Sequence, residues 1–177
     1  MIKNETKYDL NKAIFYAGHS LGEYSALTAT ESIRFEDTLK LLKIRGKSMQ
    51  SAVPKGEGGM IAVLGAEINN VTEIISNNNK KYQCFIANDN SVGQIVVSGK
   101  TNDINLFADD LKKAKIKNIK LKVSAPFHCR LMNHATDIMK NEISQSTIAD
   151  SKNKIIANVT AKEAYKAQEI KNLLIQQ

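Results

Sequence analysis

The chain has 177 residues, of which 42% are hydrophobic and 24% are charged, which is typical of a soluble globular protein with a sizeable core. No apolar run reaches the roughly 18–20 residues that span a bilayer, and residues 1–6 lack the apolar core of a secretory signal. Two cysteines, Cys84 and Cys129, are too few for a disulfide framework or a cysteine metal site. We therefore expect a cytoplasmic protein in a reducing compartment, with no membrane segment. We also expect a monomer that holds no metal or cofactor.

The formal net charge of +7 is compatible with nucleic acid or with any acidic partner. The excess is spread lysine without a dense basic block, and few aromatic residues are present to stack on bases. This pattern favours a solvated surface, so we expect no nucleic-acid partner. The only three arginines are Arg34, Arg45 and Arg130.

The first predicted elements are a strand followed by two helices. Residues 13–17 form a short apolar run that predicts a buried strand, and residues 20–30 predict a helix rich in small and apolar side chains. A second helix begins at Phe35 and is limited by Pro54.

The pattern changes after residue 57. Strands are predicted over 60–64, 83–87, 94–98 and 118–124, and helices over 70–77 and 101–114, with "NDNSVG" as a turn. This β-α-β-β-α-β order is that of a ferredoxin-like unit, which we place at 57–125 as an insert.

The remaining residues, 126–177, are predicted to complete the part of the chain formed by residues 1–56. A helix over 129–147, a strand over 154–159 and a last helix over 167–176 follow one another there. The sequence therefore predicts an α/β protein with one subdomain inserted into another.

The segment "GHSLG", residues 18–22, has the G-x-S-x-G spacing of a nucleophile elbow. In such a turn the serine, here Ser20, takes a cramped backbone conformation that exposes its hydroxyl. The backbone N–H of Leu21 would lie at a helix N-terminus and point to where an oxyanion forms. The alternative is that glycine and serine simply mark a loop.

A serine nucleophile needs a base, and the chain has three histidines. His128 follows a predicted strand and a proline, in a loop position that can face a cleft. His19 adjoins Ser20, and neighbours on a strained turn usually point apart, while His134 lies within a helix. His128 is therefore the best candidate, although each histidine alone is more often structural.

Arg45 precedes Gly46 in a predicted helix, where glycine costs about 1 kcal/mol. We interpret this glycine as a sign of close packing, which would place Arg45 near something specific. A guanidinium pairs bidentately with a carboxylate, which lysine cannot do. Near a serine nucleophile, Arg45 would indicate an acyl substrate with a free carboxylate. The alternative is a solvated helix charge.

Six segments in this order resemble the malonyl-CoA:acyl carrier protein transacylase family of type II fatty-acid synthesis: GHSLGEYSAL, IRGKSMQ, GGMIAVLG, ANDNSVGQIVVSG, VSAPFHCRLM and NVTA. The resemblance covers the chain from about residue 13. It implies an incomplete α/β-hydrolase-like large subdomain with an inserted ferredoxin-like small subdomain. It also implies transfer of malonyl from malonyl-CoA to a serine, and then to the phosphopantetheine thiol of acyl carrier protein as the partner.

The resemblance implies a role for each matching residue. Ser20 would be the nucleophile and His128 the base, Arg45 would bind the malonyl carboxylate, and the Leu21 amide would be one oxyanion donor.

The resemblance extends to the small subdomain and to the two ends of the chain. Asn88 and Asn90 would line the cleft, and the backbone carbonyl of Gln177 would orient the histidine. Members of this family begin with a strand and a "GQGSQ"-like loop that supplies the second oxyanion donor, and they continue past the position of Gln177. We therefore expect the chain to be an internal fragment.

Other functions stay open at this point. A serine hydrolase or thioesterase would use Asp103, Asp109 or Asp110 as its third catalytic member and would have no use for a buried Arg45. The chain could also be an inactive fragment that binds carrier protein, or an acyltransferase domain of a larger synthase.

Overall fold

The computed structural model describes residues 5, 9–123 and 125–177. These residues form two compact units, each described here by itself. The first unit comprises residues 1–46 and 136–177, and the second comprises residues 47–135. Within the described residues, no helix is long and apolar enough to cross a membrane, and no three His, Cys, Asp or Glu side chains gather as a metal site would require.

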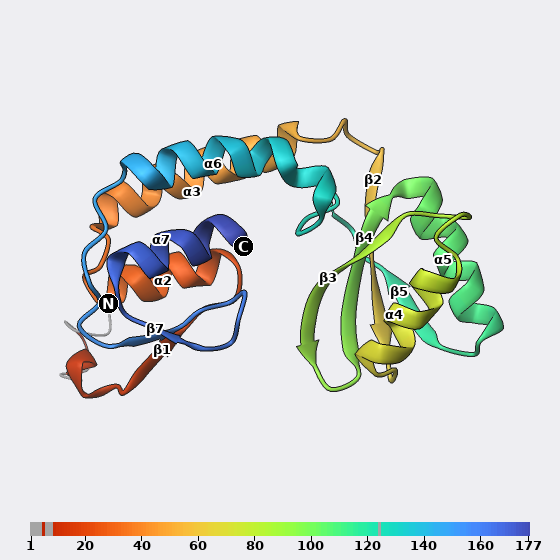
Figure 1. The fold of residues 1–177 in the computed structure, drawn as a ribbon, viewed down its shortest axis with the longest axis horizontal. Coiled ribbons are helices and arrows are strands. Elements are labelled where there is room, and N and C mark those ends of the chain that lie inside the picture. The colour runs from red at the N-terminus through yellow and green to blue at the C-terminus, as the bar shows by residue number, and fades with distance from the viewer. Residues whose placement is uncertain (1–4, 6–8, 124) are drawn as a thin grey trace. The chain divides into compact units, whose positions relative to one another are not determined.

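The first unit holds a small sheet and the helices that pack with it (Figure 1). Its elements, with α3 and α6 extending into the second unit, are η1 (Leu10–Lys12), β1 (Phe15–Ala17), α2 (Leu21–Ala29), α3 (Phe35–Ser51), α6 (Asn133–Gln145), β6 (Lys154–Ile156), β7 (Glu163–Ala164) and α7 (Ala167–Gln176). The strand order is β1-β6-β7, with β1 parallel and β7 antiparallel to β6. Its core draws on four helices and β6, and the buried side chains include Tyr24, Leu27, Leu41, Ile143, Ile155, Ile170 and Leu174.

The predicted burial of the first strand is wrong. Phe15 of β1 is 48% exposed and the preceding Ile14 is 72% exposed. In the sheet formed by the described residues, β1 pairs with β6 alone and so lies at an edge. An apolar run cannot reveal how many neighbours its strand will have.

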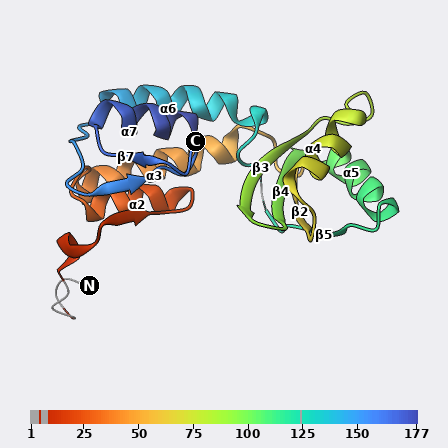
Figure 2. The same ribbon diagram turned by 60° about the horizontal axis from the view of Figure 1, so that its bottom comes forward.

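The second unit is a four-stranded antiparallel sheet with two helices. Its elements are β2 (Gly58–Leu64), α4 (Ile68–Asn77), β3 (Cys84–Ser91), β4 (Gln94–Lys100), α5 (Thr101–Lys113), β5 (Lys117–Lys120) and η2 (Arg130–Met132). The strand order is β3-β4-β2-β5. Helices α4 and α5 cover one face (Figures 1 and 2).

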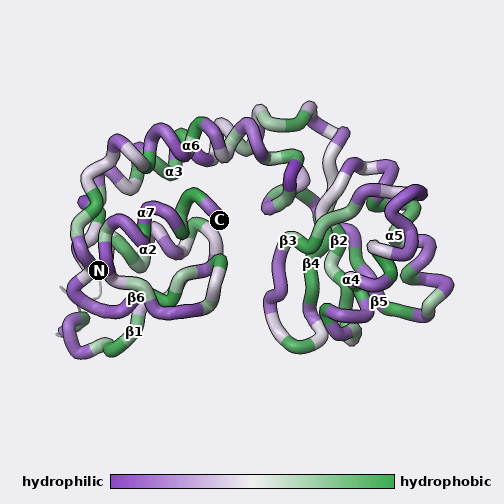
Figure 3. Tube along the Cα trace, viewed as in Figure 1, coloured by the Kyte–Doolittle hydropathy of each residue, from purple (hydrophilic) through white to green (hydrophobic). Residues whose placement is uncertain are grey.

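The alternation of apolar residues along the two central strands explains this packing. Ile61 and Val63 of β2, with Ile95 and Val97 of β4, are almost completely buried in one cluster with Phe107 of α5. A hydrophobic stretch is visible along β4 in Figure 3. Because side chains point to alternate faces of a strand, these residues all meet the helices.

Three boundaries in this unit differ from the predicted ones. The strand predicted over 118–124 pairs with β2 only as far as Lys120, and residue 124 lies outside the described residues. The chain then leads to Pro126, whose Cδ would lie 2.1 Å from a methyl group at Gly58. Much of the predicted "NDNSVG" turn belongs to β3, which continues to Ser91 through two irregularities in register. The helix predicted over 129–147 is divided into η2 and α6.

Candidate active site

Ser20 lies on a strained turn between β1 and α2. Its φ of 53° and ψ of −111° fall in a region that non-glycine residues rarely adopt. A methyl group at Gly18 would lie 1.9 Å from the carbonyl oxygen of Gly22, so only glycine fits there. At Gly22 itself an added methyl group would meet no described atom of its unit within 4 Å. The local structure is thus the strand–turn–helix context of a nucleophile elbow.

The first turn of α2 offers a hydrogen-bond donor beside Ser20. The N–H of Gly22 donates to the His19 carbonyl at 2.9 Å, and the N–H of Glu23 donates to the Ser20 carbonyl at 3.2 Å. Leu21 is the first helical residue, so its N–H has no intrahelical acceptor. A backbone donor at a helix N-terminus suits a developing oxyanion. The oxyanion role of Leu21 stays a prediction.

Arg45 of α3 contacts the Ser20 hydroxyl directly. Its Nη2 donates to Ser20 Oγ at 3.0 Å and to Gln177 Oε1 at 3.1 Å. The guanidinium also lies 6.0 Å from the centre of the Tyr24 ring. Partial burial lowers the pKa of Arg45, although an arginine stays charged in proteins. The alternative of a solvated helix charge is therefore wrong.

Close packing at Gly46 does not explain the position of Arg45. A methyl group at Gly46 would meet no described atom of its own unit within 4 Å, so the predicted close packing is wrong. The guanidinium is held instead by hydrogen bonds to two side chains from other elements.

A buried carboxylate that sequence reasoning missed connects these groups. Glu23 is only 2% exposed, and its Oε2 accepts hydrogen bonds from the Asn158 N–H at 3.2 Å and from Gln177 Nε2 at 2.6 Å. Asn158 Oδ1 in turn accepts the N–H of Ser20. Burial raises the pKa of Glu23, while these two hydrogen bonds and the charge of Arg45 act in the opposite direction.

Gln177 is held by its side chain in the first unit. Its amide bridges Arg45 and Glu23, whereas the predicted role concerned its backbone carbonyl and the histidine. Because His128 belongs to the other unit, that role stays a prediction.

His128 lies in the second unit, in a loop that buried groups hold in place. Its φ of 56° is strained. The preceding Phe127 carbonyl accepts a hydrogen bond of 2.6 Å from Ser98 Oγ, and Ser98 is fully buried on β4. Cys129 Sγ donates to the Pro126 carbonyl at 3.0 Å. These contacts fix the backbone on both sides of His128.

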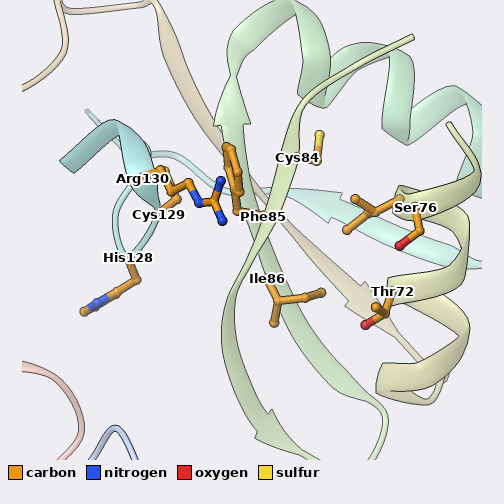
Figure 4. A pocket seen from close by; sticks show the side chains of 9 residues that line it. Thr72, Ser76, Cys84, Phe85, Ile86, His128, Cys129 and Arg130 are labelled. Atoms are coloured by element: carbon orange, nitrogen blue, oxygen red, sulfur yellow. The ribbon is translucent and has the colours of Figure 1, made fainter. Parts of the chain in front are cut away.

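The same loop borders a pocket of about 410 Å³ (Figure 4). The pocket is lined by Thr72, Ile75, Ser76, Cys84, Phe85, Ile86, His128, Cys129 and Arg130. The guanidinium of Arg130, one of the three arginines, lies 6.0 Å from the centre of the Phe85 ring. This arginine therefore has an aromatic partner within the pocket lining. The other two histidines, His19 and His134, have exposed side chains.

The two predicted asparagines both lie on β3, one of the two edge strands of the sheet in the second unit. Asn88 is half-buried and Asn90 is exposed. They belong to the same unit as His128, and their predicted place in a cleft stays a prediction.

The aspartates considered for a hydrolase triad have partners within the second unit. Asp109 pairs with Lys112 at 3.3 Å and Asp110 with Lys81 at 2.7 Å, and Asp103 accepts the Gln83 N–H at 3.2 Å. Each carboxylate is therefore already engaged on or beside α5, which weakens the hydrolase hypothesis.

The profile of one protein family, described as "Acyl transferase domain", matches residues 9–173. The chain belongs to this acyl transferase family. Among curated relatives, the malonyl CoA-acyl carrier protein transacylase of Bacillus subtilis is 39% identical over 167 residues, which cover 92% of this chain and 52% of the relative. The enzyme of the same name from Salmonella typhimurium is 36% identical over 162 residues, covering 91% and 52%. The chain thus spans about half the length of these curated relatives.

Solved structures of acyl transferases share this chain's fold over the part that it covers. The acyl-carrier-protein-S-malonyltransferase of Bartonella henselae superposes with a TM-score of 0.93 at 38% identity, covering 99% of this chain and 56% of that one. A malonyl-transacylase solved in complex with its type II PKS acyl-carrier protein gives a TM-score of 0.88 at 33% identity, covering 93% and 54%. The predicted α/β class is confirmed.

Proposed function

We propose that this acyl transferase chain moves a malonyl group from malonyl-CoA to the phosphopantetheine thiol of an acyl carrier protein through a malonyl-Ser20 intermediate. The observation that carries the proposal is the 3.0 Å hydrogen bond from Arg45 Nη2 to Ser20 Oγ. It places a permanent cation beside the hydroxyl that would attack the thioester. A malonyl group carries a free carboxylate one methylene away from its thioester carbonyl, and a guanidinium is the natural partner for that carboxylate.

The strand arrangement within each compact unit supports the two proposed subdomains, although the second unit, 47–135, extends beyond the proposed 57–125 at both ends. The ferredoxin-like subdomain proposed at 57–125 agrees with the strand order β3-β4-β2-β5 and two helices on one face. The α/β-hydrolase-like subdomain, proposed at 1–56 and 126–177, agrees with the elbow that follows β1 and with the parallel pairing of β1 and β6.

In the first half-reaction, His128 takes the hydroxyl proton as Ser20 Oγ attacks the thioester carbon. The carbon–oxygen bond forms, and negative charge develops on the former carbonyl oxygen, which the Leu21 N–H stabilises. The tetrahedral intermediate then collapses, the carbon–sulfur bond breaks, and His128 returns the proton to the coenzyme A thiolate. Arg45 holds the malonyl carboxylate throughout.

In the second half-reaction, the same groups act in reverse on the carrier. His128 takes the proton of the phosphopantetheine thiol, whose sulfur attacks the malonyl ester carbon. The ester bond then breaks, and the proton passes to Ser20 Oγ. Asn88 and Asn90 would line the cleft, and the Gln177 carbonyl would orient the imidazole.

Mass spectrometry of the carrier protein tests this function. After incubation with the protein, malonyl-CoA and phosphopantetheinylated carrier, we expect the carrier to gain one malonyl group. Free malonate without labelled carrier would instead support the serine hydrolase hypothesis. Binding of the carrier without any malonyl transfer would support an inactive carrier-binding fragment.

The net charge of +7 leads to a prediction about salt. If the lysines attract an acidic carrier protein, the carrier affinity should fall steeply with salt, because the Debye length shrinks from about 10 Å at 0.1 M to about 3 Å at 1 M. Titration calorimetry across that range measures this effect. An affinity unchanged by salt would mean that the lysines serve solubility alone.

A further inference from the structure

Glu23 and Ser20 belong to one closed ring of hydrogen bonds, in which two branches connect them. One branch runs from the carboxylate through Asn158 to the Ser20 backbone N–H. The other runs through the Gln177 amide and the Arg45 guanidinium to Ser20 Oγ. Through these two branches, the buried Glu23 carboxylate is linked to both the backbone N–H and the hydroxyl of the candidate nucleophile. All the members of the ring belong to the first unit.

The hydrogen-bond donors and acceptors of this ring match one another in only one orientation of the Gln177 amide. An ionised carboxylate has no proton to donate, so Gln177 must present its NH₂ group to Glu23. The amide oxygen of Gln177 is then left for Arg45, which can only donate. Glu23 thus determines which end of the Gln177 amide faces the guanidinium.

Because Glu23 is buried, removing it should disturb the hydrogen-bond ring more than removing an exposed residue would. Its side chain is 2% exposed, and its two hydrogen-bond donors would lose their acceptor if it were removed. Unsatisfied buried donors are costly, and so is a half-buried cation such as Arg45 without a nearby carboxylate.

We propose that Glu23 is a positioning residue, which anchors the Ser20 backbone through Asn158 and the carboxylate-binding guanidinium of Arg45 through Gln177. The part that concerns the substrate carboxylate rests on the proposed malonyl transfer. The part that concerns Ser20 does not, because the ring includes the Ser20 backbone and hydroxyl whatever acyl group the hydroxyl receives. The hydrogen bonds of the Glu23 carboxylate described above go to Asn158 and Gln177, so we assign it a positioning role that acts through these residues.

Phosphonylation by a neutral, serine-directed fluorophosphonate tests the ring without malonyl-CoA. In this reaction Ser20 Oγ attacks phosphorus and fluoride leaves. We expect Glu23→Ala to slow the reaction of the purified protein at least about tenfold, because the ring loses its common acceptor. Glu23→Gln keeps an oxygen acceptor of the same size, so it should recover most of that loss.

Thr30→Ala is the matched control, at a buried polar residue that caps the opposite end of α2. Thr30 is 3% exposed, follows α2, and donates to the Leu27 carbonyl at 3.1 Å, outside the ring. This variant loses a comparable buried hydrogen bond but leaves the ring intact. At matched thermal stability it should therefore react within about twofold of the wild type. Wild-type reactivity in Glu23→Ala would overturn the proposal. So would a Glu23→Gln variant as slow as Glu23→Ala, because hydrogen bonding would then not be the cause.

Acyl selectivity provides a second readout. With malonyl-CoA and acetyl-CoA as donors, Glu23→Ala should reduce the preference for malonyl at least about fivefold, because Arg45 loses its anchor. An unchanged preference would overturn the Arg45 branch. A wild type that reacts with the fluorophosphonate but transfers no malonyl would refute the proposed function, while the ring would still be judged by phosphonylation.

Discussion

Replacing His128 with alanine is expected to lower the rate of malonyl transfer by about 10²–10⁴-fold, the usual effect of removing a general base. The reason is that the Ser20 hydroxyl is a weak nucleophile until its proton is taken. Hydrogen bonds from Ser98 and Cys129 hold the backbone on either side of His128. A fixed backbone suits a residue that must present its ring in one orientation. Single-turnover acylation by malonyl-CoA measures the step directly.

His134→Ala is the matched control, because His134 is an exposed residue of α6. We expect this variant to transfer malonyl at close to the wild-type rate. The opposite pattern, with His134→Ala inactive and His128→Ala active, would move the base into α6 and contradict the proposed mechanism.

Arg45→Ala is expected to abolish the preference for malonyl over acetyl, which should be at least about a hundredfold in the wild type. A charge-assisted contact with the malonyl carboxylate contributes roughly 1.5–3 kcal/mol. Acetyl leaves the half-buried guanidinium unpaired by substrate, which costs further free energy. Malonyl transfer should therefore fall in Arg45→Ala, while acetyl transfer is retained or rises. Parallel rate measurements with both coenzyme A esters give the ratio.

Arg45→Lys separates charge from shape at this position. Lysine keeps the positive charge but cannot form the two parallel hydrogen bonds of a guanidinium, so we expect poor malonyl transfer from this variant as well. If Arg45→Ala lowered malonyl and acetyl transfer equally, Arg45 would be structural. The recognition of a carboxylate would then lose its main physical support.

The elements whose residues share one clear face could be predicted from the sequence. The last helix, α7, occupies the predicted residues 167–176, and α5 ends one residue before the predicted end. Short strands are harder to predict, because two or three residues carry little hydrophobic pattern. The two-residue strand β7 was not predicted at all. The exposure of Phe15 depends on strand neighbours that local sequence does not encode.

The candidate site was predictable where a residue type is unusual for its context. The G-x-S-x-G spacing indicated Ser20, and the scarcity of arginine drew attention to Arg45, although the reason given at Gly46 was wrong. Glu23 and Asn158 were missed because the contact that joins them spans 135 positions in the chain. The signal available in the sequence was an acidic residue among the small and apolar residues of α2. A carboxylate buried there needs a hydrogen-bond partner to offset the cost of its desolvation.

Peptide mass spectrometry after brief incubation with malonyl-CoA tests the central claim most directly. The account predicts one malonyl group on the peptide that contains Ser20, its removal when phosphopantetheinylated carrier protein is added, and no label in Ser20→Ala. A malonyl label that survives in Ser20→Ala, or that forms on another residue of the wild type, would contradict the account.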